Sequence, residues 1–144
     1  MTKVLTGAAT ASDIMTLGAA TIHENDSLLQ AVELLTDHRV SALPVLDDAG
    51  KLTGILTEGD FLRLNGFHLA TVLTKPLELR RQELERSLVR EVMTRDCVTT
   101  GPDTSLHDAI ELMDRRGLKR LPVLAEGQFV GLLSGSDLLQ ALVE

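Results

Sequence analysis

The sequence predicts an α/β fold made of two copies of one β-α-β-β-α unit. Three observations lead to this expectation. The segment LPVL occurs at residues 43–46 and again at 121–124, equivalent residues surround it in the same order, and each copy changes from helical spacing to short apolar runs at the same place. A repeat that keeps its spacing usually marks a unit that cannot bury its apolar face alone, so the copies should pack together.

The alignment of the two copies includes polar and glycine positions as well as apolar ones. It needs a gap of one residue, in the turn that follows each LPVL. Chance similarity between two apolar segments would not also match glycines and aspartates, so we interpret the match as a duplication. The matched pairs include Ile14-Met15-Thr16 with Val92-Met93-Thr94, Ser27-Leu28 with Ser105-Leu106, Gly54 with Gly131, and Asp60 with Asp137.

Each copy should begin with a short strand and an amphipathic helix. The expected strands are residues 19–22 and 97–100. Ser27 with Gln30 is typical of a capping box at a helix start, and Ser105 with Asp108 is a looser version. The apolar residues that follow have the i, i+3, i+4, i+7 spacing of one helix face. They are Leu28, Ala31, Val32 and Leu35 in the first copy, and Leu106, Ala109, Ile110 and Met113 in the second.

The second half of each copy should be a hairpin followed by a short helix. LPVL is a short apolar run, as in a strand covered on both faces. Polar turns at 47–51 and 125–128 separate these runs from second strands at 52–56 and 129–133. The second strands end at Thr57 and Ser134, so short helices are expected to begin near Asp60 and Asp137.

The repeats divide the chain into four parts. We expect an N-terminal segment at 1–11, a first repeat at 12–63, a connector at 64–90 and a second repeat at 91–144. The connector should contain a solvated helix from Leu77 to Arg90, with three leucines on roughly one face: Leu77, Leu84 and Leu88. The alternative is that one of its arginines reaches a ligand phosphate or a partner chain; these are Arg80, Arg81 and Arg86.

Composition narrows the possible functions. The chain has 144 residues, a net charge of −7, three phenylalanines and no tryptophan or tyrosine. Nucleic-acid binding needs a basic footprint, and single-stranded partners also need stacking aromatics, so we expect no DNA or RNA partner. No nucleophile elbow, Walker loop or HExxH zinc motif occurs, so we expect no enzyme.

Metal and membrane sites are also not expected. Cys97 is the only cysteine and is expected to be a small buried apolar residue. The four histidines, His23, His38, His68 and His107, lack metal-ligand spacing, and His38 is expected at a helix end. No apolar run is long enough to span a membrane, and the first residues have no apolar signal core. We therefore expect a cytoplasmic protein with no membrane partner.

The candidate site is the turn from the second strand to the short helix. Each copy has Gly, two apolar residues, Thr or Ser, two further residues and Asp, at 54–60 and 131–137. A carboxylate there could accept hydrogen bonds from both hydroxyls of a ribose, beside the Thr57 or Ser134 hydroxyl and the free N–H groups of a helix start. The alternative is that Thr-x-x-Asp or Ser-x-x-Asp only caps the helix and needs no ligand.

These motifs resemble a tandem pair of CBS domains, also called a Bateman module. The shared marks are Met-Thr near the start, the amphipathic helix, HRVSALPV at 38–45, and the Gly-to-Asp turn. HRVSALPV and SGSDLLQALV at 134–143 are similar to the repeats of the regulatory gamma subunit of AMP-activated protein kinase. The resemblance implies two repeats packed about a pseudo-two-fold axis, with two ligand clefts between them.

The resemblance also implies which residues bind the ligand. Backbone near the first strand and before LPV of one copy would hold adenine, and the Ser or Thr and Asp of the other copy would hold ribose. One cleft would use Ala20, Val40, Ser41 and Pro44 with Ser134, Ser136 and Asp137. The other would use Val98, Leu118, Lys119 and Pro122 with Thr57 and Asp60.

The two implied clefts differ in charge. Lys119 and Arg120 match positions that often contact phosphate, whereas the first cleft has Ser41 and Ala42 there. Glu58 departs from the more polar or basic residues usual in the turn, and it would repel a phosphate in the second cleft. We therefore do not expect the two clefts to be equally occupied.

The expected function is that of a regulatory module that binds an adenosine nucleotide (AMP, ADP or ATP) and is read by an unidentified effector protein. The nucleotide would be a regulatory ligand, with no resident cofactor. The resemblance implies a dimer, and the apolar helix faces favour a symmetric homodimer. Three alternatives stay open: a structural dimerisation module without ligand, a binder of another adenosyl ligand (NAD, S-adenosylmethionine or a cyclic dinucleotide), and a nucleotide hydrolase.

Overall fold

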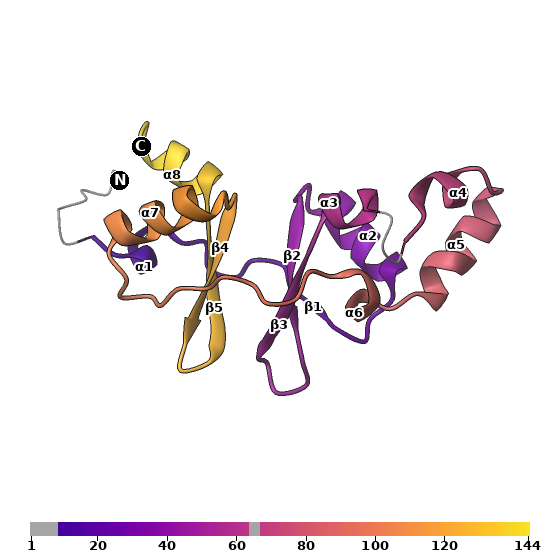
Figure 1. The fold of residues 1–144 in the computed structure, drawn as a ribbon, viewed down its shortest axis with the longest axis horizontal. Helices are drawn as coiled ribbons and strands as arrows, with labels where there is room; N and C mark the ends of the chain where they lie inside the picture. The colour runs from indigo at the N-terminus through magenta and orange to yellow at the C-terminus, as the bar shows by residue number, and fades with distance from the viewer. Residues whose placement is uncertain (1–8, 64–66) are drawn as a thin grey trace. The chain divides into compact units, whose positions relative to one another are not determined.

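The computed structural model describes residues 9–63 and 67–144, and the chain forms two compact units (Figure 1). The first unit joins Met1–Ala19 to Val98–Glu144, and the second is Ala20–Cys97. The α/β class and the two repeated units agree with the sequence prediction. The units do not follow the repeat boundaries, because the residues that begin each repeat belong to the unit of the other repeat.

The second unit contains a three-stranded sheet in the order β1-β2-β3. β1 (Ile22–His23) runs parallel to β2 (Ala42–Leu46), and β2 pairs antiparallel with β3 (Leu52–Thr57), with Leu43 opposite Leu56. Helix α2 (Leu28–Asp37) connects the two parallel strands, as a parallel pair requires a crossover. The expected strand at 19–22 is thus shorter and begins later. Helix α3 (Glu58–Leu62) follows β3 directly.

The first unit contains a two-stranded hairpin of β4 (Arg120–Ala125) and β5 (Gln128–Ser134), with Leu121 opposite Leu133. Helix α1 (Ala11–Ile14), helix α7 (Leu106–Arg116) and helix α8 (Gly135–Ala141) complete it. The prediction of a strand at 97–100 was wrong. Only Thr100 forms a bridge, parallel to Val123, with backbone bonds of 3.0 Å to the Pro122 carbonyl and 2.8 Å from the Leu124 N–H.

Each unit has its own apolar core. In the second unit the predicted face of α2 is confirmed for Leu28, Ala31 and Leu35, which pack with β2 and β3. In the first unit Ala109 and Met113 of α7 pack with the β4-β5 hairpin. Ile110 differs from the prediction, because its side chain is 45% exposed. The i, i+4 spacing from Leu106 assigned Ile110 to the buried face, but in the structure it lies at the margin of that face.

The helix starts follow the predicted caps. The Ser27 hydroxyl accepts the Gln30 N–H at 3.2 Å, and the Gln30 side chain accepts the Ser27 N–H at 2.9 Å. At α7 only the Ser105 hydroxyl is used, accepting the Asp108 N–H at 3.0 Å. The capping box at Ser27 is therefore confirmed, whereas Ser105 is confirmed only as an N-cap, and His38 is the C-cap of α2 as expected.

The repeated Met-Thr segments pack against the strand of the unit to which they belong. The backbone of Thr16 exchanges two hydrogen bonds with Leu132 of β5, and that of Thr94 exchanges two with Ile55 of β3. Each methionine lies over a glycine: Met15 over Gly131 and Met93 over Gly54. A packed junction was the sequence interpretation of Met-Thr, and the structure confirms it.

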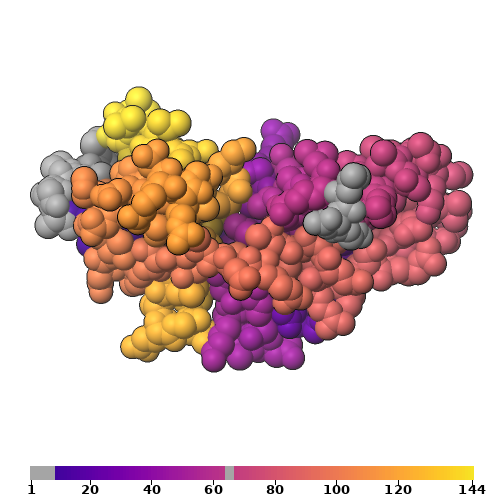
Figure 2. All heavy atoms as spheres, viewed as in Figure 1, coloured from indigo at the N-terminus to yellow at the C-terminus, as the bar shows by residue number. Residues whose placement is uncertain are grey.

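In the described part of the chain between the repeats, two short helices take the place of the single expected helix from Leu77 to Arg90, and a further short helix precedes them. They are α4 (Leu69–Leu73), α5 (Leu77–Arg86) and α6 (Val89–Val92). The predicted helix to Arg90 is wrong at its end, because Ser87 and Leu88 are extended and bond to the start of α2: the Leu28 N–H donates to the Ser87 carbonyl at 2.9 Å. The atoms of α4 and α5 lie together at the surface of this unit (Figure 2).

The connector arginines bond to neighbouring groups in the same unit. Arg80 donates to the Lys75 carbonyl at 2.7 Å, Arg81 lies 4.0 Å from Glu33, and Arg86 lies 3.6 Å from Glu83. Lys75 also donates to Glu83 at 2.7 Å, and this bond lowers the pKa of the Glu83 carboxyl. These contacts agree with the interpretation as a solvated connector. None of the described helices has both the length and the apolar character needed to cross a membrane.

Candidate functional site

The strand-to-helix turn of the second unit is a capping box. Thr57 is the N-cap of α3, and its hydroxyl accepts the Asp60 N–H at 3.3 Å. Oδ2 of Asp60 accepts the Thr57 N–H at 2.8 Å and the Thr57 hydroxyl at 3.2 Å. The two side chains therefore each satisfy one backbone N–H that the helix start would otherwise leave unpaired.

The first unit repeats the same turn. Ser134 is the N-cap of α8, its hydroxyl accepts the Asp137 N–H at 3.1 Å, and Oδ2 of Asp137 accepts the Ser134 N–H at 3.1 Å. The capping role that the sequence left open is thus present in both copies. In neither copy does capping use both carboxylate oxygens, because Oδ1 points elsewhere.

Oδ1 of each aspartate accepts the threonine hydroxyl of a Met-Thr segment. The Thr94 hydroxyl donates to Asp60 at 2.7 Å, and the Thr16 hydroxyl donates to Asp137 at 2.9 Å. These two threonines were missed as site residues by the sequence reasoning. The signal for them was present, because Met-Thr is repeated at equivalent places; what was missing was the packing that brings it to the aspartate.

The two aspartates differ in burial and charge partners. Asp60 is 2% exposed, and the guanidinium of Arg63 donates to its Oδ1 and, at 3.0 Å, to the Thr94 hydroxyl. Asp137 is only half-buried. The repeat alignment places Gln140, an exposed residue of α8, where the first copy has Arg63. Arg63 was not anticipated as part of the site.

The segment before each LPV strand lies beside this turn within its own unit. The Glu58 N–H donates to the Ser41 carbonyl at 3.0 Å, and the Gly135 N–H donates to the Lys119 carbonyl at 3.0 Å. Each unit therefore brings together one predicted adenine-contacting segment and one predicted ribose-contacting turn. The assignment of these two parts to different clefts stays a prediction.

The predicted site residues fall into three classes of exposure. Pro44 and Pro122 are buried within strands and have little surface to offer a ligand. Ala20 and Val98 are half-buried and pack against the cores of their units. The rest have accessible surface, apart from the buried Asp60: Val40, Ser41, Lys119 and Ser136 are exposed, and Thr57, Leu118, Arg120, Ser134 and Asp137 are half-buried.

The charge of the segment before the strand differs between the units. Lys119 and Arg120 place two cations there in the first unit, whereas the second unit has Ser41 and Ala42 at the equivalent positions. In the second unit the exposed Glu58 lies next to the turn. The first unit therefore has the local charge that suits a phosphate.

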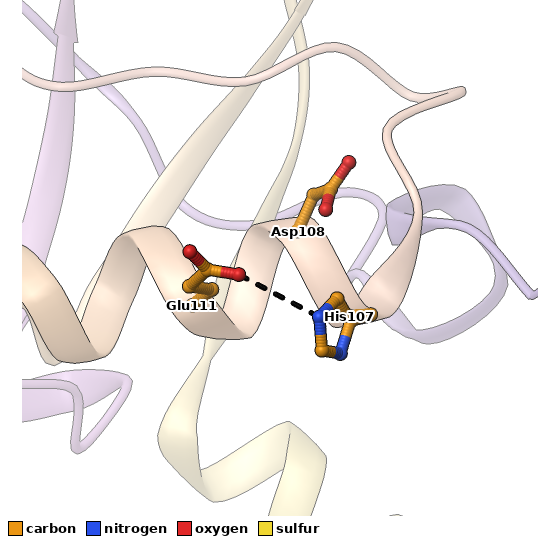
Figure 3. A group of neighbouring side chains, drawn as sticks. All are labelled: His107, Asp108 and Glu111. Carbon is orange, nitrogen blue, oxygen red and sulfur yellow. Dashed lines mark ion pairs between the residues drawn. The ribbon is translucent and has the colours of Figure 1, made fainter.

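A group of possible metal donors lies at the start of α7. The ligand atoms of His107, Asp108 and Glu111 lie within 4.8 Å of one another, and all three residues are exposed (Figure 3). His107 and Glu111 form an ion pair at 3.5 Å when the imidazole is charged. The sequence prediction of no metal-ligand spacing missed this group. The positive end of the helix disfavours a cation there, so we assign the group only the ion pair.

Cys97 was expected to be buried and is only partly buried in this structure. Its thiol lies 3.7 Å from the Thr94 carbonyl. Burial raises the pKa of the Cys97 thiol, with smaller contributions from the Asp60 and Asp96 charges that act in the same direction. A raised pKa disfavours the nucleophilic thiolate.

Comparison with known proteins finds one family over most of the chain. The family model of the CBS domain matches residues 11–65 and 89–144. The uncharacterized protein MJ1426 of Methanocaldococcus jannaschii is 32% identical over 142 residues, which cover 85% of this chain and 84% of that protein. The CBS domain of a CBS domain-containing membrane protein from Sphaerobacter thermophilus is 29% identical with a TM-score of 0.77, over 94% of this chain and 88% of that chain.

A second solved structure adds a ligand. The crystal structure of CBSX2 in complex with AMP is similar to this chain, with 27% identity and a TM-score of 0.73. The similarity covers 94% of this chain and 96% of CBSX2. The fold of this chain is therefore similar to that of a protein whose crystal structure contains AMP.

Proposed function

Since the chain belongs to the CBS domain family and contains two such repeats, we propose that it is a regulatory module that binds an adenosine nucleotide: AMP, ADP or ATP. The observation that carries the proposal is the repeated turn in which an aspartate lies beside a hydroxyl, with Asp137 still partly accessible. A carboxylate so placed can accept hydrogen bonds from the hydroxyls of a ribose. The AMP complex of CBSX2 supports the choice of ligand.

The proposed contacts follow the chemistry of each group. Backbone of the segments before the LPV strands would bind adenine, the aspartates with their hydroxyl neighbours would bind ribose, and Lys119 with Arg120 would bind phosphate. The accessible candidates are Val40, Ser41, Leu118, Lys119, Arg120, Thr57, Ser134, Ser136 and Asp137. Pro44, Pro122, Ala20 and Val98 would shape the surroundings from within the cores.

Regulation requires that the nucleotide bind one state of the protein better than another. We propose that the module forms a homodimer in the cytoplasm and that an effector protein distinguishes its nucleotide-bound state. Light scattering with and without AMP measures the first part of this proposal. We propose a regulatory role and no nucleotide hydrolysis, because the sequence of the two CBS repeats contains no catalytic motif of a hydrolase.

Thermal unfolding with added nucleotide tests the proposal. At a concentration of 100 times Kd, a ligand that binds only the folded state adds about 2.7 kcal/mol to the free energy of unfolding. We expect AMP, ADP or ATP to raise Tm, and Asp137→Asn to remove most of that rise while keeping an oxygen for the cap. Asp108→Asn is the matched control, because Asp108 is likewise the third residue of a capped helix but lies outside the proposed site.

The second candidate is a structural dimerisation module without ligand. Its supporting observation is that both aspartates already cap helices, so neither needs a ligand to be satisfied. If no adenine nucleotide raises Tm, and NAD, S-adenosylmethionine and a cyclic dinucleotide also fail, the structural function is the correct one. A rise with one of the latter three alone would keep the binding module and change its ligand.

A further inference from the structure

The Asp60 carboxylate has no acceptor position left. A carboxylate offers about four lone-pair positions. In Asp60, Oδ2 accepts the Thr57 N–H and the Thr57 hydroxyl, and Oδ1 accepts the Thr94 hydroxyl and the Arg63 guanidinium. Its side chain is also almost completely removed from solvent, at 1% exposure. A ribose hydroxyl could bind only by displacing one of these donors.

Asp137 accepts fewer hydrogen bonds. Within residues 9–63 and 67–144, one donor reaches each of its oxygens, the Ser134 N–H on Oδ2 and the Thr16 hydroxyl on Oδ1. About two of its lone-pair positions are therefore available. Since Asp137 is also half-buried rather than enclosed, a diol could reach those positions without displacing a donor.

Arg63 is the donor that would be hardest to displace. A guanidinium on a carboxylate is a charge-assisted pair, roughly twice as strong as a neutral hydrogen bond, whereas a ribose hydroxyl is a neutral donor. Arg63 is the one cation paired with Asp60 among the described residues, and separating the two would leave the buried carboxylate uncompensated, which is strongly unfavourable. The Arg63 side chain is 56% exposed, so its guanidinium keeps contact with solvent. Forming the pair therefore costs little desolvation free energy on the arginine side.

The two copies differ at the residue three positions after the aspartate, which is Arg63 in the first copy and Gln140 in the second. Helix α3 ends at Leu62, and Arg63 has extended backbone (φ −80°, ψ 146°) that returns its side chain to Asp60. Helix α8 continues to Ala141, and its equivalent residue, Gln140, is neutral and faces solvent. Both copies have the capping box and the threonine donor on Oδ1, and the Thr57 hydroxyl is a further donor to Asp60 alone.

We infer that Arg63 closes the Asp60 carboxylate to ligands, so that the chain binds a single adenosine nucleotide, whose ribose hydroxyls are held by Asp137. The inference rests on the proposed function and specifies it. Arg63 is then a specificity-determining residue that sets the number of nucleotides bound per chain. It acts on the ligand only through its bond to Asp60.

Isothermal titration of the full chain with AMP tests this inference. The wild-type protein should bind one AMP per chain. Arg63→Gln, which gives the first copy the residue that the second copy has at position 140, should bind two. Gln140→Arg should place a guanidinium beside Asp137, because residues three apart on a helix are neighbours, and it should weaken AMP binding by about 10- to 100-fold, the effect of one hydrogen bond to a charged group. Arg86→Gln is the control, an exposed arginine of the same unit as Arg63.

Each outcome is informative. Two equivalent AMP sites in the wild-type protein, or unchanged stoichiometry in a folded Arg63→Gln variant, would overturn the inference and leave the proposed function standing. If Arg63→Gln does not fold, Gln140→Arg decides, because Gln140 lies on the surface, and undiminished AMP binding there counts against the inference. Absence of AMP binding to the wild-type chain together with no stabilisation by any adenosyl compound would remove both proposals.

Discussion

At the scale of single residues, two glycines are constrained by the methionines that cover them. A Cβ atom at Gly54 would lie 2.7 Å from both the Met93 sulfur and the Thr94 carbonyl oxygen. One at Gly131 would lie 2.6 Å from the Met15 sulfur and 3.1 Å from the Thr16 carbonyl oxygen. The repeat therefore conserves glycine in both copies for close approach of the Met-Thr backbone, and a side chain would push that backbone away.

We predict that Gly54→Ala and Gly131→Ala each lower the free energy of unfolding by about 1–3 kcal/mol, the usual cost of overpacking. Urea denaturation measures this loss. The control is Gly59→Ala in α3, where the nearest atom to a new Cβ is the Thr57 hydroxyl oxygen at 3.5 Å. That substitution should be neutral or stabilise by up to about 1 kcal/mol, because alanine favours helix. Equal losses at Gly54 and Gly59 would contradict the close-approach argument.

At the scale of elements, the start of α2 and the end of α5 depend on each other. Ser27 forms the capping box of α2 and also bridges to Leu88, and the Leu28 N–H bonds to the Ser87 carbonyl just beyond α5. The first turn of α2 is thus stabilised by its own capping box and by hydrogen bonds to the extended backbone at residues 87–88. This is why the connector leaves the helical conformation at Ser87 although its sequence favours helix.

We predict that Ser27→Ala lowers the free energy of unfolding by about 1 kcal/mol, because the Gln30 N–H loses its acceptor. Ser27→Asp should keep most of the stability, since aspartate also accepts at an N-cap. Thermal unfolding followed by circular dichroism compares the two. An alanine variant as stable as wild type would mean that the backbone bonds to residues 87–88 hold the turn without the cap.

At the scale of the whole molecule, the first packing unit is built from two distant stretches of chain, and the second is continuous but packs its last residues into the core that its strands form. In the first unit Ala11 is fully buried and its N–H donates to the Thr104 carbonyl at 2.8 Å, while Thr16 adds backbone bonds to Leu132. In the second unit Val89, Val92 and Met93 are buried in the core that also contains β2 and β3. The first unit is incomplete when its N-terminal stretch is removed.

We predict that deleting residues 1–19 destabilises the first unit more than the second. The Leu132 N–H loses the Thr16 carbonyl to which it donates at 3.1 Å, and the core loses Ala11. Hydrogen exchange should show faster exchange in β5 and α8, with β2 and β3 as the internal reference. Unchanged protection of β5, or equal loss in both units, would contradict the packing described here.

Sequence reasoning predicted the repeat, the hairpins, both caps and the packed Met-Thr junctions. The hairpins and caps depend on residues within a few positions of each other, such as Ser27 with Gln30 and Thr57 with Asp60, so their spacing is enough to indicate them. The Met-Thr junctions join distant residues, and only the repetition of Met-Thr in both copies indicated them. It failed at 97–100 and beyond Arg86, where backbone bonds to distant segments decided the conformation. Propensity is a weak prior where such tertiary bonds compete.

The sequence by itself determined that the chain contains two similar turns, each with an aspartate that can cap a helix. Only the tertiary structure decided that these aspartates are unequal. Thr16 and Asp137 lie 121 positions apart, and no local spacing brings them together. The bond from Arg63 depends on where α3 ends and on the burial of Asp60, since a carboxylate that has left solvent retains its cation.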